Sequence, residues 1–186
     1  EGITKITPED MEYAREMGRS IKLLGTSKKL GDDSFYALVA PFLVGQDNPL
    51  YGVKGVFNSI FVHGNMLGDA MFYGSGAGKL PTASAVVADV VDCAKNKGRN
   101  IMMSWSEEKL NLLQIDDVKS RFFVRVSGHA AERQSEIEEL FGKVEIVAVP
   151  SLSEEFAFIT GEITEQEYRE KAEKLDGIQS RIRARI

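Results

Sequence analysis

The chain has 186 residues, 43% of them hydrophobic and 27% charged, with a formal net charge of -5 and a pI near 5.2. This composition is typical of one large or two small globular domains and excludes a disordered protein. The charge gives no reason to expect nucleic-acid or membrane binding, and no apolar run is long enough to span a bilayer. Because the sequence opens Glu-Gly-Ile-Thr-Lys, without an initiator methionine or a signal peptide, we expect a piece of a longer protein.

The first third of the chain combines one helix with several strands. Thr7-Pro8-Glu9-Asp10 is a typical helix start, with a capping side chain, a first-turn proline and acids at the positive end of the dipole. We expect an apolar stripe at Met11, Ala14 and Met17, and an end at Gly18. Strands are expected at residues 20–26 and 35–44, the second covered on two sides and interrupted by Pro41, and a hairpin at 56–63 and 68–73.

A glycine-rich segment, Gly74-Ser75-Gly76-Ala77-Gly78, leads into a predicted helix at residues 81–97. The helix has an apolar face at Ala83, Val86, Val87, Val90, Val91 and Ala94. Its single cysteine, Cys93, excludes an internal disulfide and is expected to be a buried thiol in a reducing compartment. Glycines allow close approach to a ligand, and a helix start favours an anionic or polar partner, but from the residues alone a plain tight turn is the favoured explanation.

The second half has a regular pattern. Residues 99–119 are mixed in character and are interpreted as a link between domains. Strands are expected at 121–127, 144–149, 155–160 and 178–186, with one helix of about 12 residues after the first strand and a second opened by the capping box Thr164-Glu165-Gln166-Glu167. The order βαββαβ indicates a ferredoxin-like half-barrel with two helices on one sheet face. The fold class is therefore α+β, a mixed sheet with helices followed by this module.

Three passages resemble homoserine dehydrogenase. They are Gly2–Thr7 with Ile21–Gly25, then Pro49–Asn58, and above all Phe72–Asp89, which reads FYGSGAGKLPTASAVVAD. The βαββαβ tail resembles an ACT domain, an amino-acid-sensing module. The resemblance implies that residues 1–98 are the C-terminal part of the catalytic and dimerisation domain, 99–119 a linker, and 120–186 an ACT regulatory domain.

The resemblance also implies an activity. The family interconverts L-homoserine and L-aspartate 4-semialdehyde with NADP or NAD, in the cytoplasm, on the route to threonine and methionine. It implies that Gly74, Gly76, Ala77, Gly78 and Thr82 lie along the cofactor, although Thr82 could instead cap the helix. The family's Rossmann domain and catalytic lysine precede the part seen here, so we assign no catalytic residue in this chain and expect it to be inactive alone.

In ACT domains the ligand-binding loop follows the first strand, which places Gly128, His129 and Ala130 as candidate effector residues, with L-threonine as the effector. The sequence lacks the Asp-x-Pro-Gly stretch common at this place. The alternative is that the module only joins subunits. We expect a homo-oligomer, a dimer or tetramer, and the final strand suits the pairing because it has an apolar face and is free to extend.

Other functions were weighed against this one. A free-standing ACT regulator that senses an amino acid is the main alternative, and a phosphate-binding protein is a weaker one because no Walker lysine follows Gly78. His63 is expected to be an exposed turn residue, and Lys22 and Lys79 lie outside the family's catalytic segment. Two histidines and one cysteine, far apart, predict no metal site.

Overall fold

The computed structural model describes residues 1–99 and 102–185. Two compact units make up the chain: Glu1–Tyr51 with Lys109–Ile186, and Gly52–Glu108. Among the described residues, no helix has the length and apolar character required to cross a membrane.

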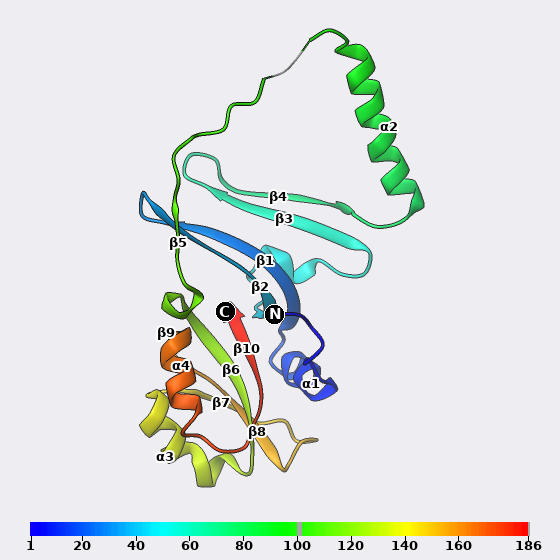
Figure 1. Cartoon of the computed structure of the whole chain (residues 1–186). Helices are drawn as coiled ribbons and strands as arrows, with labels where there is room; N and C mark the ends of the chain where they lie inside the picture. The colour runs from blue at the N-terminus through cyan, green and yellow to red at the C-terminus, as the bar shows by residue number, and fades with distance from the viewer. Residues whose placement is uncertain (100–101, 186) are drawn as a thin grey trace. The chain divides into compact units, whose positions relative to one another are not determined.

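The first unit is built on one mixed sheet, whose strands run β1-β2-β10-β6-β8-β7 across it (Figure 1). The bounds in that order are Ser20–Leu30, Ser34–Val44, Ile178–Arg185, Lys119–Ser127, Glu155–Ile159 and Glu145–Val147. Two short strands extend the pairing, β5 (Asn111–Leu112) beside β2 and β9 (Ile163–Thr164) beside β6. Short 3-10 turns lie at η1 (Pro49–Gly52) and η2 (Ile115–Asp117).

The predicted βαββαβ order is present in this unit. The strands β6, β7, β8 and β10 alternate with α3 (Ala130–Phe141) and α4 (Glu165–Ala172), and their spatial order β10-β6-β8-β7 is that of a ferredoxin-like sheet. Both helices cover the same sheet face, where Ile137, Phe141 and Tyr168 pack on Phe122, Val124 and Phe158. The capping box at Thr164 and Glu167 opens α4 as predicted.

The opposite sheet face is covered by α1 (Pro8–Glu16), which Figure 1 shows on the other side of the sheet from α3 and α4. Tyr13 and Ala14 pack there against Phe123 and Ile182. The helix begins as predicted, with Thr7 and Asp10 forming a capping box. Its predicted stripe is partly wrong: Met11 is exposed, while Asp10 and Tyr13 are buried, because Asp10 pairs with an arginine of the sheet.

The strand predictions need one correction. The proline in β2 implied an edge, a bulge or an early end, and the edge alternative holds: β2 continues to Val44, and its pairing with β10 starts only at Phe42, so no amide hydrogen is needed from Pro41 on that side. The final strand, expected to be free to extend, is not an edge. Strand β10 lies between β2 and β6, and the outer strands of the sheet are β1 and β7.

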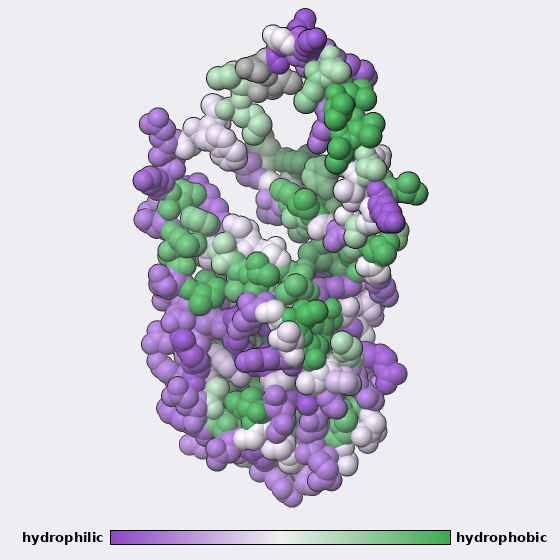
Figure 2. Space-filling model, turned by 45° about the vertical axis from the view of Figure 1, so that its right-hand side comes forward, coloured by the Kyte–Doolittle hydropathy of each residue, from purple (hydrophilic) through white to green (hydrophobic). Residues whose placement is uncertain are grey.

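The second unit contains a hairpin and a helix. Strands β3 (Phe57–Gly64) and β4 (Gly68–Ser75) pair in register from Phe57–Ser75 to Gly64–Gly68, which confirms the predicted hairpin. The helix α2 (Lys79–Lys95) starts two residues before the predicted range. Apolar residues of both elements are exposed, among them Ile60, Phe72 and Val90, and Figure 2 shows apolar side chains on the surface of this unit.

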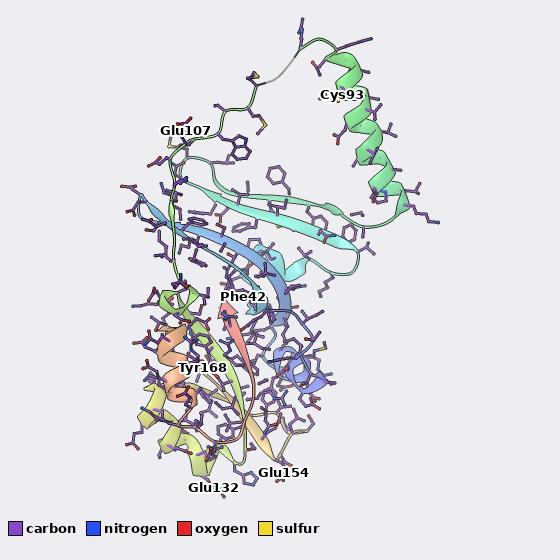
Figure 3. The ribbon with its side chains drawn as sticks, viewed as in Figure 1. Phe42, Cys93, Glu107, Glu132, Glu154 and Tyr168 are labelled. Atoms are coloured by element: carbon purple, nitrogen blue, oxygen red, sulfur yellow. The ribbon has the colours of Figure 1, made fainter. Side chains whose placement is uncertain are left out.

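Cys93 lies on α2 and is exposed, so the prediction of a buried thiol is wrong for this chain (Figure 3). The pattern of the helix was interpreted correctly as amphipathic, and its apolar residues Val86, Val87, Val90 and Val91 are exposed. The sequence pattern shows that a face is apolar and cannot show which part of a protein covers it.

The compact units are divided differently from the domains expected at 1–98 and 120–186. Strands β1 and β2 join the sheet of the βαββαβ module, because β2 pairs in parallel with β10 at Phe42–Val44. The expected link contains β5 and η2 as well as irregular chain, and its residues 100 and 101 lie outside the described residues. The functional division into a catalytic part and a regulatory part stays a prediction.

Candidate functional site

The glycine-rich segment connects the end of β4 to the start of α2. Gly74 is in the strand, paired with Asn58, and Gly78 is the residue before the helix. All residues from Gly74 to Leu80 are exposed. The segment therefore presents bare backbone at a helix start, as the sequence predicted.

Two of the three glycines have a reason within the fold. A Cβ at Gly76 would lie 2.4 Å from Nδ2 of Asn58, closer than real Cβ atoms come to any neighbour. Gly78 has a φ of 115°, which L side chains rarely adopt. The tight-turn interpretation therefore accounts for Gly76 and Gly78.

Gly74 has no such reason. A Cβ there would meet no atom within 4 Å, and its φ is not positive. Glycine in a strand interior weakens the strand and often marks a close approach by another molecule. Gly74 is therefore the glycine that a bound ligand would best explain.

The start of α2 adds hydrogen-bond donors. No side chain caps the helix, and Pro81 in the first turn has no N–H, so the amides of Lys79 and Leu80 are donors without a partner among the described residues. Thr82 uses its own amide on the Gly78 carbonyl at 3.2 Å and is exposed. Its hydroxyl does not cap the helix, which leaves ligand contact as the role predicted for it. Ala77 is exposed beside these donors.

The other candidate residues near the hairpin are placed as follows. His63 lies at the end of β3, exposed, with Nδ1 2.5 Å from Oδ1 of Asp69 on β4. Its neighbour is a surface carboxylate within the same hairpin, in line with a surface role. In the described part of the chain, no three His, Cys, Asp or Glu side chains are grouped so as to hold a metal ion.

The predicted effector loop lines a cavity in the first unit. The cavity measures about 280 Å³, and its lining includes Gly128, His129 and Ala130, from one side, and Pro150, Ser153 and Glu155 from the other. Gly128 has a φ of 100°, and its amide donates to the Glu154 carbonyl at 2.8 Å, which ties the two sides together. His129 is the N-cap of α3, but its side chain makes no capping bond.

Sequence reasoning missed the charged residues beside this cavity. Arg125, on β6 between buried apolar neighbours, has a side chain only 6% exposed. It donates to Asp10 at 2.9 Å and to Glu155 at 3.1 Å. Burial and the nearby charge of Glu155 raise the pKa of Tyr13, whose ring lies beneath the Arg125 guanidinium, to about 12. The signal available in the sequence was an arginine inside the alternating run Phe122–Val126.

Comparison with known proteins bears on both regions. The family model for homoserine dehydrogenase matches residues 1–91, a range that contains the hairpin, the glycine segment and most of α2. The homoserine dehydrogenase of Helicobacter pylori is 40% identical over 126 residues, which cover 68% of this chain and 30% of that protein. Residues 1–91 belong to the homoserine dehydrogenase family. The homoserine dehydrogenase of Neisseria gonorrhoeae is 37% identical over 134 residues, again covering 68% of this chain.

Solved homoserine dehydrogenases extend the likeness to the whole chain. The crystal structure of the enzyme from Thiobacillus denitrificans superimposes on 100% of this chain and 47% of its own, with a TM-score of 0.80 and 28% identity. The S. aureus enzyme at pH 7.0 gives a TM-score of 0.73 at 24% identity, which shows a shared fold. The chain spans about 30% of the length of these curated homoserine dehydrogenases and just under half of the solved ones.

Proposed function

We propose that this chain serves in an NAD(P)-dependent homoserine dehydrogenase, which interconverts L-homoserine and L-aspartate 4-semialdehyde in the cytoplasm. Its part is to contact the nicotinamide cofactor through Gly74, Gly76, Ala77, Gly78 and Thr82. The bound cofactor, NADP or NAD, supplies the hydride acceptor of the oxidation. No residue of this chain is assigned to the chemical step.

The single observation that carries this proposal is the bare backbone at Gly74. The fold does not require glycine there, because a side chain would meet nothing in the described structure. The amides of Lys79 and Leu80 are donors at the positive end of a 17-residue helix, which suits a phosphate or a carboxamide oxygen. The residues present therefore fit a dinucleotide lying along the segment.

The test is the Gly74→Val substitution in the complete enzyme. A branched side chain would occupy the space proposed for the cofactor, so we expect the KM for NADPH to rise at least tenfold, with little change in thermal stability. The matched control is Gly161→Val, because Gly161 is also exposed with open space around its Cβ position and lies in the other unit. An unchanged KM for NADPH in Gly74→Val would contradict the cofactor contact.

A second candidate function is amino-acid sensing by the βαββαβ module. The cavity beside Gly128, His129 and Ala130 supports it, since its size suits a small polar ligand such as L-threonine. This module would regulate the dehydrogenase, or, as the alternative, act as a free-standing ACT regulator. The two differ in whether the complete protein oxidises homoserine.

A homo-oligomer, a dimer or tetramer, is also proposed. With β10 internal, the outer strands β1 and β7 are the edges that could pair with a second copy. Strand β1, with 11 residues, is the longer of the two. Sedimentation as a monomer at high concentration would contradict this proposal.

A further inference from the structure

We propose that Glu155, Arg125 and Asp10 form a relay that couples occupancy of the cavity beside Gly128 to the seating of helix α1. The proposal rests on the amino-acid-sensing part of the proposed function and adds the route by which that module would act on the front of the chain. All three residues lie in the same compact unit.

Arg125 is the centre of the relay. One of its terminal nitrogens, Nη1, donates to Oδ1 of Asp10 at 2.9 Å and to the hydroxyl of Thr7 at 2.7 Å. These residues are the capping box that starts α1, and Asp10 is fully buried. The same Asp10 oxygen accepts from Ser180 on β10 at 2.5 Å. The first turn of α1 is thus held on the sheet by a buried cation from β6.

The other terminal nitrogen of Arg125 points to the cavity side. Nη2 donates to Oε2 of Glu155 at 3.1 Å, and Glu155 lines the cavity. Oε1 of Glu155 and Nε of Arg125 are buried without a hydrogen-bond partner among the described residues. A buried carboxylate oxygen without a partner is costly, and Oε1 is closed off from solvent in the ligand-free chain, so a donor group of a ligand would reach it only when the Glu155 side chain turns toward the cavity.

Asp10 and Glu155, the two ends of the relay, both pair with the single positive charge of Arg125. A cationic donor on Glu155, such as the ammonium group of an amino acid, would compete with Arg125 for that carboxylate. Because Arg125 is buried, it must then turn toward Asp10 or leave its site, and either movement changes how the first turn of α1 is held. Thermodynamic linkage makes the effect reciprocal. If the ligand changes the free energy with which α1 packs on the sheet, a change in that packing alters the free energy of ligand binding by the same amount.

The ligand-free test uses Glu155→Gln in the whole chain, with amide hydrogen exchange of residues 11–17 as the readout. Glutamine keeps an acceptor and removes the charge, so α3 and β6 should keep their protection while the α1 amides exchange about three- to tenfold faster. The control is Glu154→Gln, an exposed neighbour that makes the same charge change (Figure 3). The reciprocal variant Asp10→Asn should speed exchange at the cavity amides of Gly128 and Leu152.

Addition of L-threonine separates the relay from the proposal on which it rests. Binding that alters α1 exchange in the unmodified chain, but not in Asp10→Asn, would support the relay. Binding that leaves α1 exchange unchanged would overturn it, as would unchanged α1 exchange in Glu155→Gln. If L-threonine does not bind, the sensing proposal fails, and the relay is judged by the Glu155→Gln result alone.

Discussion

At the scale of single residues, three glycines close together have three different explanations. Gly76 gives room to Asn58, Gly78 adopts a positive φ, and Gly74 has neither constraint. The sequence predicted that this segment needs little side-chain bulk, because glycines recur at short spacing. It could not show which glycine contacts another residue of this chain. The contact of Gly76 is with Asn58, which lies on the adjacent strand, and only the register of the two strands brings the residues together.

This difference changes how the site should be tested. A bulky residue at Gly76 would not test the cofactor contact alone, because its Cβ would also meet the Asn58 side chain. We therefore predict that Gly76→Ala lowers the free energy of unfolding by up to about 1 kcal/mol, because the exposed Asn58 side chain must turn aside and give up its hydrogen bond to the Val56 carbonyl. The double variant Asn58→Ala with Gly76→Ala should recover most of the loss in urea denaturation. Equal stability of Gly76→Ala and the unmodified chain would contradict this contact.

At the scale of elements, the starts of helices were the most predictable features. The predicted cap at Thr7 and the predicted capping box at Thr164 are local patterns of a few residues, and both are present. Burial was less predictable, because it depends on distant partners. Phe123 and Arg125 of β6 are buried as well as Phe122 and Val124, since α1 covers the second face of the sheet. The sequence of β6 shows that apolar residues alternate along the strand. It does not show that α1 covers the second face of the sheet.

Helix α4 gives a prediction about pH. Burial against the sheet raises the pKa of Tyr168 to about 12, whereas an exposed tyrosine in the unfolded chain titrates near 10. Between pH 10 and 12 the unfolded chain releases a proton that the folded chain retains, so the free energy of unfolding falls as the pH rises. The loss from this residue approaches roughly 2 kcal/mol at pH 12.

Tyr168→Phe removes this loss. Urea unfolding at pH 8 and at about pH 11 should show a smaller decrease in stability for the variant than for the unmodified chain. Tyr73→Phe serves as the control because Tyr73 is exposed on the hairpin. The account of α4 is wrong if all three proteins lose stability equally over this interval.

At the scale of the whole molecule, the sequence predicted the order of elements better than their grouping. The βαββαβ order was predictable from alternation and helical spacing, but the joining of β1 and β2 to the same sheet was not. That joining depends on parallel pairing between Phe42–Val44 and Arg183–Arg185, which are separated by most of the chain. The exposure of the apolar face of α2 and of Cys93 was not predictable either, because periodicity shows which face is apolar and not what covers it.

The most direct test of the cofactor proposal is a crystal structure of the complete enzyme with NADP and L-homoserine bound. We predict that atoms of the nicotinamide half lie within about 4 Å of the backbone at Gly74 and near the amides of Lys79 and Leu80. A dinucleotide bound with no atom near residues 74–82 would contradict the central claim, even if the enzyme proved fully active.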